Sequence, residues 1–225
     1  MGNPALTFIF VDLAGFTALT EVHGDRDAAD TVDVFVDRVR ESLEPADRLV
    51  KTIGDAVMLT SPTPQSAVDL TRRIIDSTHR ERHFPQTRAG LHHGTAIERD
   101  DDYVGGAVNL AARVAAQAGA DQTLCTATVA AAARSLGVEV IDRGPFNLRN
   151  IAEEVDLFEL LLCPGLQGTV VDPVCRARID RDQAQGRLRL DDVDHWFCSL
   201  ECAALFAAHP DRFPSATADR TRSGQ

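Results

Sequence analysis

Apolar residues follow two different spacings along the first two thirds of the chain. Residues 8–11 form an unbroken run of β-forming side chains, typical of a buried strand, and Asp12 ends that run. Over residues 27–43 the apolar positions recur every three or four residues, which predicts a helix. Residues 48–61, RLVKTIGDAVMLTS, indicate two apolar strands joined by a Gly-Asp turn, which is a hairpin.

The same alternation continues to residue 162. Helical spacing predicts helices over 66–79, 107–119 and 128–136. Apolar runs predict strands over 87–98, 122–127, 137–144, 146–150 and 154–162, with a polar turn over 100–106. Strands and helices that alternate, with hairpins between them, favour an α+β fold in which helices pack on one mixed sheet.

Composition changes along the chain and predicts two domains. Residues 1–162 form the α+β part, and residues 163–169, CPGLQGT, have the Pro and Gly content of a linker. The segment that follows, 170–215, is too short to rely on a hydrophobic core alone, and a bound metal would compensate. Residues 216–225 are polar and are predicted to be disordered.

The totals exclude several classes of protein. The chain has 225 residues, 44% hydrophobic and 25% charged, which is the composition of a soluble globular protein. We expect no membrane helix and no secretory signal, because no apolar run approaches about 18 residues and no basic region precedes the first one. This predicts a cytoplasmic location. A net charge of −11 argues against nucleic acid or an anionic membrane as partner, but allows a nucleotide.

The five cysteines are unevenly placed. Cys125 stands alone, whereas Cys163, Cys175, Cys198 and Cys202 fall in the last third of the chain. Without a secretory signal, this clustering favours a metal site over disulfides. The alternative is that free cysteines simply pack a small core.

Charged and polar residues at the ends of the predicted elements suggest a catalytic site. Asp12 alone is open to two interpretations, a helix cap or turn residue and a metal ligand. Asp55 lies in the hairpin turn and Lys51 on the strand that enters it, while Asn109 and Arg113 share one helix face. Two carboxylates at adjacent strand ends suit divalent cations, and the Arg and Asn supply donors for phosphoryl chemistry.

Residues 5–162 resemble the catalytic domain of the class III adenylate/guanylate cyclases. Five stretches carry the resemblance, in family order and at family-like spacing: FVDLAGFT, KTIGDAVM, GLHHGTA, DYVGGAVNLAARV and GPFNLRNIAEEVDLFEL. The resemblance implies the nucleotide cyclase fold, a ferredoxin-like mixed sheet with packed helices. It also implies the conversion of ATP to 3′,5′-cyclic AMP and pyrophosphate in signal transduction.

The resemblance further implies roles for individual residues. Asp12 and Asp55 would bind two Mg²⁺ or Mn²⁺ ions, one lowering the pKa of the ribose 3′-hydroxyl and the other holding the triphosphate. Asn109 would orient the ribose. Arg113 would stabilise the charge on the α-phosphate as pyrophosphate leaves.

In the family, the residues at the positions of Lys51 and Asp102 recognise the purine base. The lysine would donate to adenine N1 and the aspartate would accept from the 6-amino group, which favours ATP over GTP. The family forms its site between two catalytic domains, so the resemblance implies a homodimer with two symmetric sites. Asp12 and Asp55 of one subunit would then face the purine and ribose residues of the other.

The chain departs from the family pattern near the end of the domain. The usual Lys-Gly pair is replaced by Arg149 and Asn150. Arg149 keeps the charge and remains a candidate for substrate binding, whereas Asn150 is expected to alter the loop that approaches the phosphates. His92 and His93, beside Gly94 on a predicted strand, are interpreted as packing or hydrogen-bonded residues rather than catalytic ones.

Residues 170–215 resemble the YHS domain, a small metal-binding module related to TRASH-type folds. The match covers DPVC, HWFCS, the Cys-x₃-Cys pair and FAAHPDRF. The resemblance implies Cys175, Cys198 and Cys202 as thiolate ligands, with the last two on one helical face. The fourth ligand stays open among His195, Cys163 and a water or exogenous ligand. Three thiolates suit a soft or borderline ion such as Zn²⁺ or Cu⁺.

The sequence therefore predicts a homodimeric adenylate cyclase whose activity the C-terminal metal module adjusts. The regulatory part rests on the adjacency of the two domains alone. Two alternatives remain at this stage. One is a catalytically silent cyclase-like domain kept as a dimerisation or nucleotide-binding platform for the metal module. The other is a cyclase that uses GTP.

Overall fold

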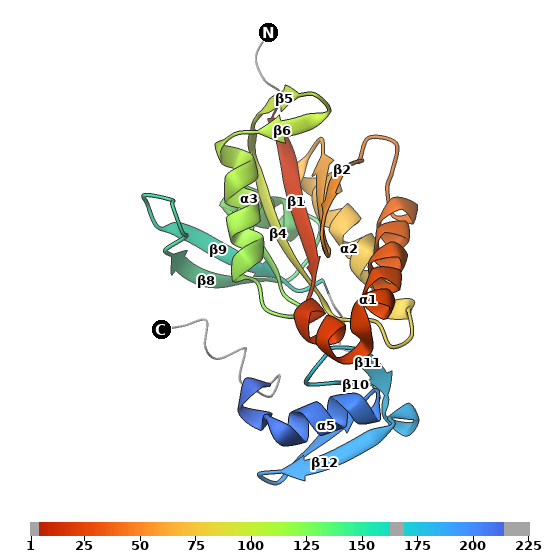
Figure 1. Ribbon diagram of the computed structural model, residues 1–225. Helices are drawn as coiled ribbons and strands as arrows, with labels where there is room; N and C mark the ends of the chain where they lie inside the picture. Colours follow the sequence, from red (N-terminus) through yellow and green to blue (C-terminus); the bar gives the residue numbers. More distant parts are fainter. Residues whose placement is uncertain (1–4, 163–168, 214–225) are drawn as a thin grey trace.

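Seven strands form one mixed sheet at the centre of the molecule (Figure 1). The computed structural model describes residues 5–162 and 169–213. In sheet order the strands are β2 (Arg48–Ile53), β3 (Ala56–Ser61), β1 (Ala5–Leu13), β4 (Thr87–Thr95), β7 (Thr123–Thr126), β9 (Val155–Leu160) and β8 (Val140–Phe146). Strands β4 and β7 pair in parallel and the other neighbours pair antiparallel. The predicted mixed α+β sheet is confirmed.

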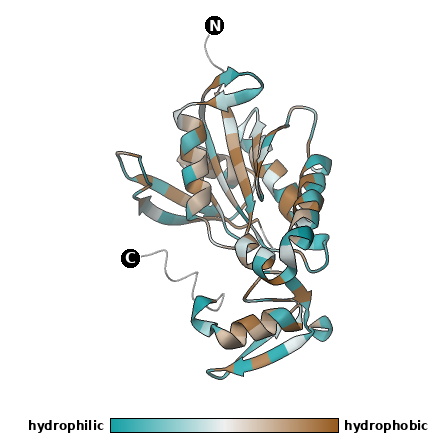
Figure 2. Ribbon diagram, in the orientation of Figure 1, coloured by the Kyte–Doolittle hydropathy of each residue, from teal (hydrophilic) through white to brown (hydrophobic). Residues whose placement is uncertain are grey.

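Helices cover both faces of the sheet. One face carries α1 (Phe16–Glu41), α2 (Pro64–Arg80) and α4 (Ala127–Ser135), and the other carries α3 (Gly106–Gln117). Side chains of β1 alternate between two hydrophobic cores. Ile9 and Val11 pack in the core under α1, α2 and α4, and Phe8 and Phe10 pack in the core under α3. Both faces of β1 are therefore apolar (Figure 2), which explains the unbroken hydrophobic run in its sequence.

Three predictions of local structure were incomplete or wrong. A helical segment that starts at Phe16 precedes the predicted helix, and α1 contains both segments, joined across a kink at Gly24 (φ 85°, ψ 168°). The predicted polar turn over 100–106 contains a strand, since β5 (Ile97–Arg99) and β6 (Asp102–Val104) form a hairpin. Residues 147–150 leave β8 as a turn instead of forming a strand.

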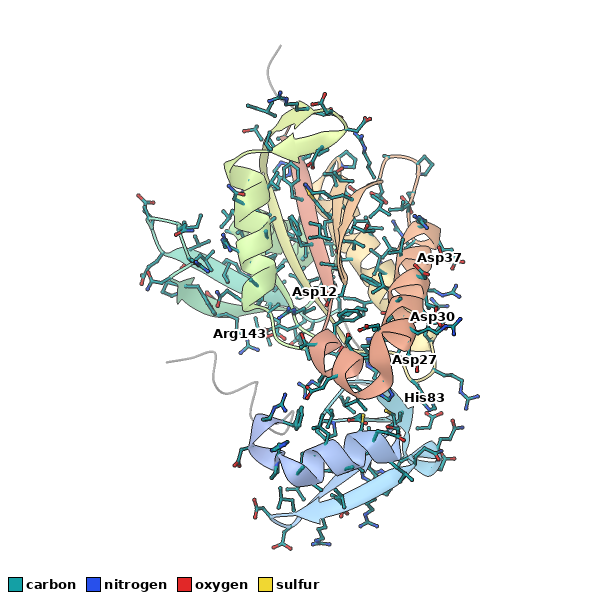
Figure 3. The ribbon with its side chains drawn as sticks, viewed as in Figure 1. Asp12, Asp27, Asp30, Asp37, His83 and Arg143 are labelled. Atoms are coloured by element: carbon teal, nitrogen blue, oxygen red, sulfur yellow. The ribbon has the colours of Figure 1, made fainter. Side chains whose placement is uncertain are left out.

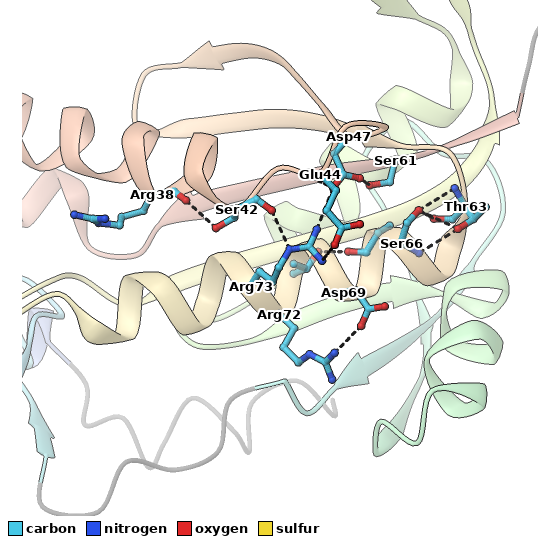
Figure 4. Close-up of polar contacts among 12 residues, drawn as sticks. Arg38, Ser42, Glu44, Asp47, Ser61, Thr63, Ser66, Asp69, Arg72 and Arg73 are labelled. Carbon is cyan, nitrogen blue, oxygen red and sulfur yellow. Dashed lines mark hydrogen bonds and ion pairs between the residues drawn. The ribbon is translucent and has the colours of Figure 1, made fainter.

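A buried polar contact fixes α1 and α2 to the strands that carry the site (Figure 4). Arg73 of α2 donates from Nε to the carbonyl of Ser42 (2.9 Å) and from Nη2 to Asp47 Oδ2 (3.1 Å). The hydroxyl of Ser61, at the end of β3, donates to the other Asp47 oxygen (2.5 Å). Because the Asp47 side chain is only 2% exposed, these bonds satisfy a carboxylate that would otherwise be costly to bury.

Residues 169–213, called the C-terminal unit below, form a small α/β structure under α1 (Figure 1). Its elements are β10 (Thr169–Val171), β11 (Arg178–Asp180), the 3₁₀ turn Arg181–Gln183, β12 (Gly186–Leu190), β13 (Val193–Phe197), α5 (Leu200–Ala208) and the 3₁₀ turn Pro210–Arg212. The unit shares its hydrophobic core with α1, since Leu19 and Ala28 pack with Phe197 and Phe206. It therefore rests on the larger domain.

Backbone bonds extend this contact. The amide of Gln86 donates to the carbonyl of Arg176 (3.0 Å), and the amide of Arg178 donates to the carbonyl of Phe84 (3.0 Å). The predicted linker, apart from Thr169, and the predicted disordered tail 216–225 lie outside the described residues. Within the part of the chain that the structure describes, no helix combines the length and the apolar run needed to cross a bilayer.

Candidate functional site

Asp12 and Asp55 lie together at one end of the sheet. Asp12 is near the end of β1, beside the start of α1 (Figure 3), and Asp55 lies in the turn between β2 and β3. The amide of Leu13 donates to the carbonyl of Asp55 (3.3 Å), which fixes the turn against the strand end. Arg88 of β4 donates to Asp12 Oδ2 from Nε (2.7 Å) and also from Nη2. The structure thus brings the two predicted metal ligands together.

The two carboxylates fit a divalent cation. Burial raises the pKa of Asp55 to about 6, and the negative charge of Asp12 adds to this shift. Two acidic groups held this close repel each other once both are ionised, and a hard cation between them would remove that repulsion. This pair of oxygen donors is the kind of ligand set that Mg²⁺ and Mn²⁺ take.

A cavity of about 420 Å³ opens beside Asp55. Its lining on the side of the sheet domain includes residues 13–18, which run from the end of β1 into α1, together with Asp55 and Arg88. The C-terminal unit supplies another part of the wall, including Arg176 and Arg212. Cationic side chains and the N-terminal end of a helix around one cavity favour a polyanionic ligand.

The two residues predicted to bind the purine base, Lys51 and Asp102, form an ion pair. The Nζ of Lys51 lies 2.5 Å from Oδ2 of Asp102, and the other carboxylate oxygen accepts the amide of Tyr103 (2.7 Å). The hydrogen bond from Lys51 lowers the pKa of Asp102, so the carboxylate is ionised at neutral pH. Strand β6, which carries Asp102, lies at the opposite end of β1 from Asp12 (Figures 1 and 3).

Asn109 and Arg113 project from the side of α3 that faces away from the sheet. The inner side of the helix consists of small residues, among them Ala111 and Ala115, which are buried. Within residues 5–162 and 169–213, neither the Asn109 nor the Arg113 side chain makes a hydrogen bond or ion pair. Both groups are therefore available to a ligand or a second chain.

Arg149 and Asn150 lie in a turn in which the second residue has a left-handed backbone. Both residues are exposed in a turn, and Asn150 has a φ of 64°. Glycine enters this left-handed region freely, and asparagine enters it more easily than other residues with a side chain. Asparagine is therefore compatible with the backbone of this turn, and its effect on the loop stays a prediction.

His92 and His93 are both held by threonines of neighbouring strands. His92 Nδ1 lies 2.9 Å from the hydroxyl of Thr126, and His93 Nδ1 lies 2.9 Å from the hydroxyl of Thr7. Burial lowers the pKa of His92 and favours its neutral form. These contacts agree with the interpretation of both residues as hydrogen-bonded sheet residues.

A second cluster of chemical groups lies where the C-terminal unit meets α1. The Sγ atom of Cys198 is 3.5 Å from that of Cys175 and 3.7 Å from that of Cys202. His23 of α1 joins them, with Nε2 3.7 Å from the sulfur of Cys198 and 3.6 Å from that of Cys202. The four ligand atoms all lie within 4.8 Å of one another, so this group could hold a metal ion.

Sequence reasoning missed His23 and misplaced Cys198. Cys198 precedes α5, so it shares no helical face with Cys202, although the two sulfurs converge as expected. His195, a predicted candidate for the fourth ligand, instead packs its ring 4.7 Å from that of Phe206. The other candidate, Cys163, lies outside the described residues. No local spacing links residue 23 to residue 175, so only the fold could show this contact.

Asp172 positions two of the thiols. Its buried carboxylate accepts the amides of Val174 (2.8 Å) and Cys175 (3.4 Å) through one oxygen and the amide of Cys198 (2.8 Å) through the other. Hydrogen bonds from the neighbouring thiols lower the pKa of Cys202, whereas hydrogen bonding and burial raise that of Cys175. One thiol of the cluster is therefore predisposed to ionise, as a metal ligand must.

Comparison with known proteins identifies relatives of the larger domain. The model of the adenylate and guanylate cyclase catalytic domain matches residues 3–161. A pH-sensitive adenylate cyclase of Mycobacterium tuberculosis is 32% identical over 163 residues, 71% of this chain and 41% of the relative. An adenylate cyclase of Streptomyces griseus is 33% identical over 116 residues, 51% of this chain and 29% of the relative. The chain thus spans less than half the length of these curated relatives.

Solved structures show the same fold. An adenylate cyclase of Trypanosoma brucei in its monomeric state has a TM-score of 0.66 at 23% identity, over 79% of this chain and 95% of that one. The guanylate cyclase domain of a Catenaria anguillulae protein, in complex with GTP, has a TM-score of 0.62 at 16% identity, over 71% and 97%. Adenylate and guanylate cyclases share this fold, so the fold alone does not distinguish ATP from GTP as the substrate.

Proposed function

The chain belongs to the adenylate and guanylate cyclase catalytic domain family through residues 3–161, and from that premise we propose that it is an adenylate cyclase. The reaction would convert ATP to 3′,5′-cyclic AMP and pyrophosphate in a homodimer. The observation that carries the proposal is the pair of carboxylates, Asp12 and Asp55, beside a cavity lined with arginines. The adenylate cyclases of Mycobacterium tuberculosis and Streptomyces griseus among its relatives support it.

The proposed chemistry joins the ribose 3′-oxygen to the α-phosphorus and breaks the bond from that phosphorus to the β-phosphate. The 3′-hydroxyl proton leaves to water and pyrophosphate departs. Two Mg²⁺ or Mn²⁺ ions bound by Asp12 and Asp55 would supply Lewis-acid assistance. Arg113 would stabilise the negative charge that develops on the α-phosphate, because a guanidinium donates to two phosphate oxygens at once.

Substrate positioning falls to side chains that are exposed in the single chain. Asn109 would orient the ribose by hydrogen bonding, and Arg149 would meet the phosphates from its turn. Lys51 and Asp102 would bind the adenine edge, and their ion pair keeps donor and acceptor side by side. Adenine offers an N1 acceptor and a 6-amino donor that match this pair, whereas guanine offers the reverse arrangement. This supports ATP over GTP.

The distribution of these groups supports a homodimer. Asp12 and Asp55 lie at one end of β1, while Asp102 lies on β6 toward the other end, and Lys51 reaches it from β2, level with Phe10. One chain therefore presents two separated half-sites, and a second copy in a two-fold arrangement would bring unlike halves together twice. We place this dimer in the cytoplasm as a prediction from the sequence.

For the cysteine cluster we propose a thiophilic metal ion. Three sulfur ligands suit Zn²⁺ or Cu⁺ better than the hard cations proposed for Asp12 and Asp55. The resemblance of this segment to YHS-type modules supports the assignment of Cys175, Cys198 and Cys202 as ligands. A role for this ion in regulating the cyclase is part of the same proposal.

The test is cyclic nucleotide formation by the purified full chain from ATP and from GTP, with Mn²⁺ and with Mg²⁺. The proposal predicts cyclic AMP from ATP and its loss in Asp55→Ala. GTP turnover instead would favour a guanylate cyclase. Nucleotide binding without turnover of either nucleotide, in a protein shown to be dimeric, would contradict the enzyme and favour the platform function.

A further inference from the structure

The cysteine cluster has the dimensions of a four-coordinate metal site. With metal–sulfur bonds of about 2.3 Å and metal–nitrogen bonds of about 2.0 Å, a tetrahedron has sulfur–sulfur edges of about 3.8 Å and sulfur–nitrogen edges of about 3.5 Å. The sulfur of Cys198 lies 3.5 and 3.7 Å from the other two sulfurs, and His23 Nε2 lies 3.7 and 3.6 Å from two of the three. His23 therefore lies where a fourth ligand belongs.

The surroundings hold these groups in place. Asp172 binds the backbone of both loops that carry Cys175 and Cys198. Ser199 caps α5 by accepting the amide of Cys202 (3.1 Å), which fixes the third thiol. On the other side of the cluster, α1 departs from helical geometry at Gly24, immediately after His23. The ligands are thus supported by bonds of their own chain, as in metal sites whose geometry is built in advance.

We propose that His23 is the fourth ligand of a Zn²⁺-type site with Cys175, Cys198 and Cys202, and that this ion fastens the C-terminal unit to α1. Three ligands belong to the C-terminal unit and one belongs to the cyclase domain. The unit is small, and its apolar core is completed by Leu19 and Ala28 of α1. A shared ion would therefore stabilise the contact between the two parts as well as the unit itself.

The first experiment measures metal binding by the full chain. The metal-free protein is titrated with Zn²⁺ and with Co²⁺, whose visible spectrum reports the ligand set. We expect one ion per chain, and at least tenfold weaker binding with an altered Co²⁺ spectrum in His23→Gln. His209→Gln is the matched control, because His209 is exposed in the same unit and outside the cluster.

A second variant and a second readout keep the test decisive if His23→Gln folds poorly. His23→Cys should restore tight binding with the spectrum of a four-thiolate site. Hydrogen exchange should show that removal of the ion loosens both residues 16–28 and the C-terminal unit. Unchanged affinity and spectrum in His23→Gln, absence of bound metal in the wild type, or loosening of the C-terminal unit alone would overturn the proposal.

A separate observation concerns the cavity beside Asp55. Arg176 and Arg212 line it from the C-terminal unit, together with Arg88 and the start of α1. Arg212 also pairs with Glu21 of α1 (3.1 Å), and the Cβ position of Gly15 would lie only 2.6 Å from the Arg176 side chain. The C-terminal unit thus reaches the loop that follows Asp12.

We infer that Arg176 and Arg212 bind the polyphosphate part of the nucleotide, an inference that rests on the proposed function of the site. Guanidinium groups suit phosphate oxygens, and Asp55 in the same cavity would hold a cation that phosphates share. The C-terminal unit would then supply part of the substrate site.

Binding of inorganic triphosphate and of a non-cyclisable ATP analogue, measured calorimetrically with Mg²⁺, tests this inference. Arg176→Gln and Arg212→Gln should each weaken both ligands about tenfold or more. Arg187→Gln, which removes an exposed arginine of the same unit outside the cavity lining, should change neither. Unchanged affinities in the first two variants would overturn the inference even if cyclic AMP forms. Weakened binding without cyclic AMP would uphold it while the proposed function fails.

Discussion

Asp55 carries an unfavourable charge in the metal-free molecule. Its pKa of about 6 reflects burial and the nearby charge of Asp12, while Arg88, the adjacent cation, donates to Asp12. An ionised Asp55 therefore costs stability in the folded chain but not in the unfolded chain, where it titrates near 3.8. That cost appears as the pH rises from about 4 to about 6, and a bound divalent cation would remove it.

We predict that Asp55→Asn stabilises the metal-free protein, and does so more at pH 7.5 than at pH 4.5. The substitution removes a charge that the folded state disfavours, and most of that charge is absent at the lower pH. Thermal unfolding of both proteins at the two pH values checks this. Equal shifts in Tm at both values would show that Asp55 is not strained by its charge.

The same titration predicts pH-dependent metal binding. Protons compete with the cation at Asp55, so the affinity for Mn²⁺ should fall about tenfold for each pH unit below about 6. Calorimetric titration between pH 5 and 7.5 measures this dependence. A flat affinity over that range would contradict Asp55 as a ligand.

Lys51 and Asp102 should decide the base. Lys51→Glu combined with Asp102→Asn offers an acceptor to guanine N1 and a donor to its O6, so the ratio of kcat/KM for ATP to that for GTP should fall by about 100-fold or more. Arg48→Gln is the control, because Arg48 lies on the same strand and pairs with the same hairpin through Glu98. If the ratio changed equally in the double variant and in Arg48→Gln, Lys51 and Asp102 would not be the residues that recognise the base.

Some site residues could be predicted from the sequence because they lie within recognisable motifs. Asp12, Asp55, Lys51 and Asp102 could be predicted because family motifs surround each of them, and the structure pairs them as expected. The contact of His23 could not be predicted, since it depends on how residues 152 positions apart pack. Whether each of these residues plays its proposed role stays a prediction.

Helix α3 is positioned by its close approach to β4. A Cβ atom on Gly90 would lie 2.1 Å from the backbone nitrogen of Ala115, so no side chain fits between helix and strand. Because α3 carries Asn109 and Arg113, this contact sets the height of the proposed catalytic groups above the sheet. The glycine thus links the sheet to the site.

We predict that Gly90→Ala destabilises the protein by about 1–3 kcal/mol, because the helix must move away from the strand. The same shift should lower kcat, since Arg113 moves with α3. Gly106→Ala at the start of the same helix should be nearly neutral, as a Cβ there meets open space. Chemical denaturation and steady-state kinetics of both variants provide the check, and full activity in Gly90→Ala would contradict this positioning role.

Elements with regular patterns were predicted well, and irregular ones were not. The hairpin of β2 and β3 and helix α2 have clean spacing and appear as expected. The start of α1 was missed because Gly24 breaks the apolar stripe, and the ribbon of β5 and β6 was missed because its strands have only three residues each. Short strands carry too few side chains to show alternation.

In the whole molecule, the C-terminal unit lies against both proposed centres. It holds the three thiols that lie around His23 and lines the cavity beside Asp55. Arg178 of β11 also forms an ion pair with Asp121 of the larger domain. The sequence indicated a metal module but gave no sign of where it would sit, because apolar packing on α1 has no local signature. This placement is what makes metal-dependent control of the cyclase testable.

The central claim, catalysis at a site shared by two copies, is tested most directly by subunit complementation. Asp55→Ala and Arg113→Ala would each inactivate both sites of a homodimer, whereas a mixed dimer has one site with both changes and one intact site. After subunit exchange, about half of the dimers in an equal mixture should be mixed, so cyclic AMP formation should recover to about a quarter of the wild-type rate. A mixture no more active than its parents, with exchange verified by native mass spectrometry, would contradict the shared site.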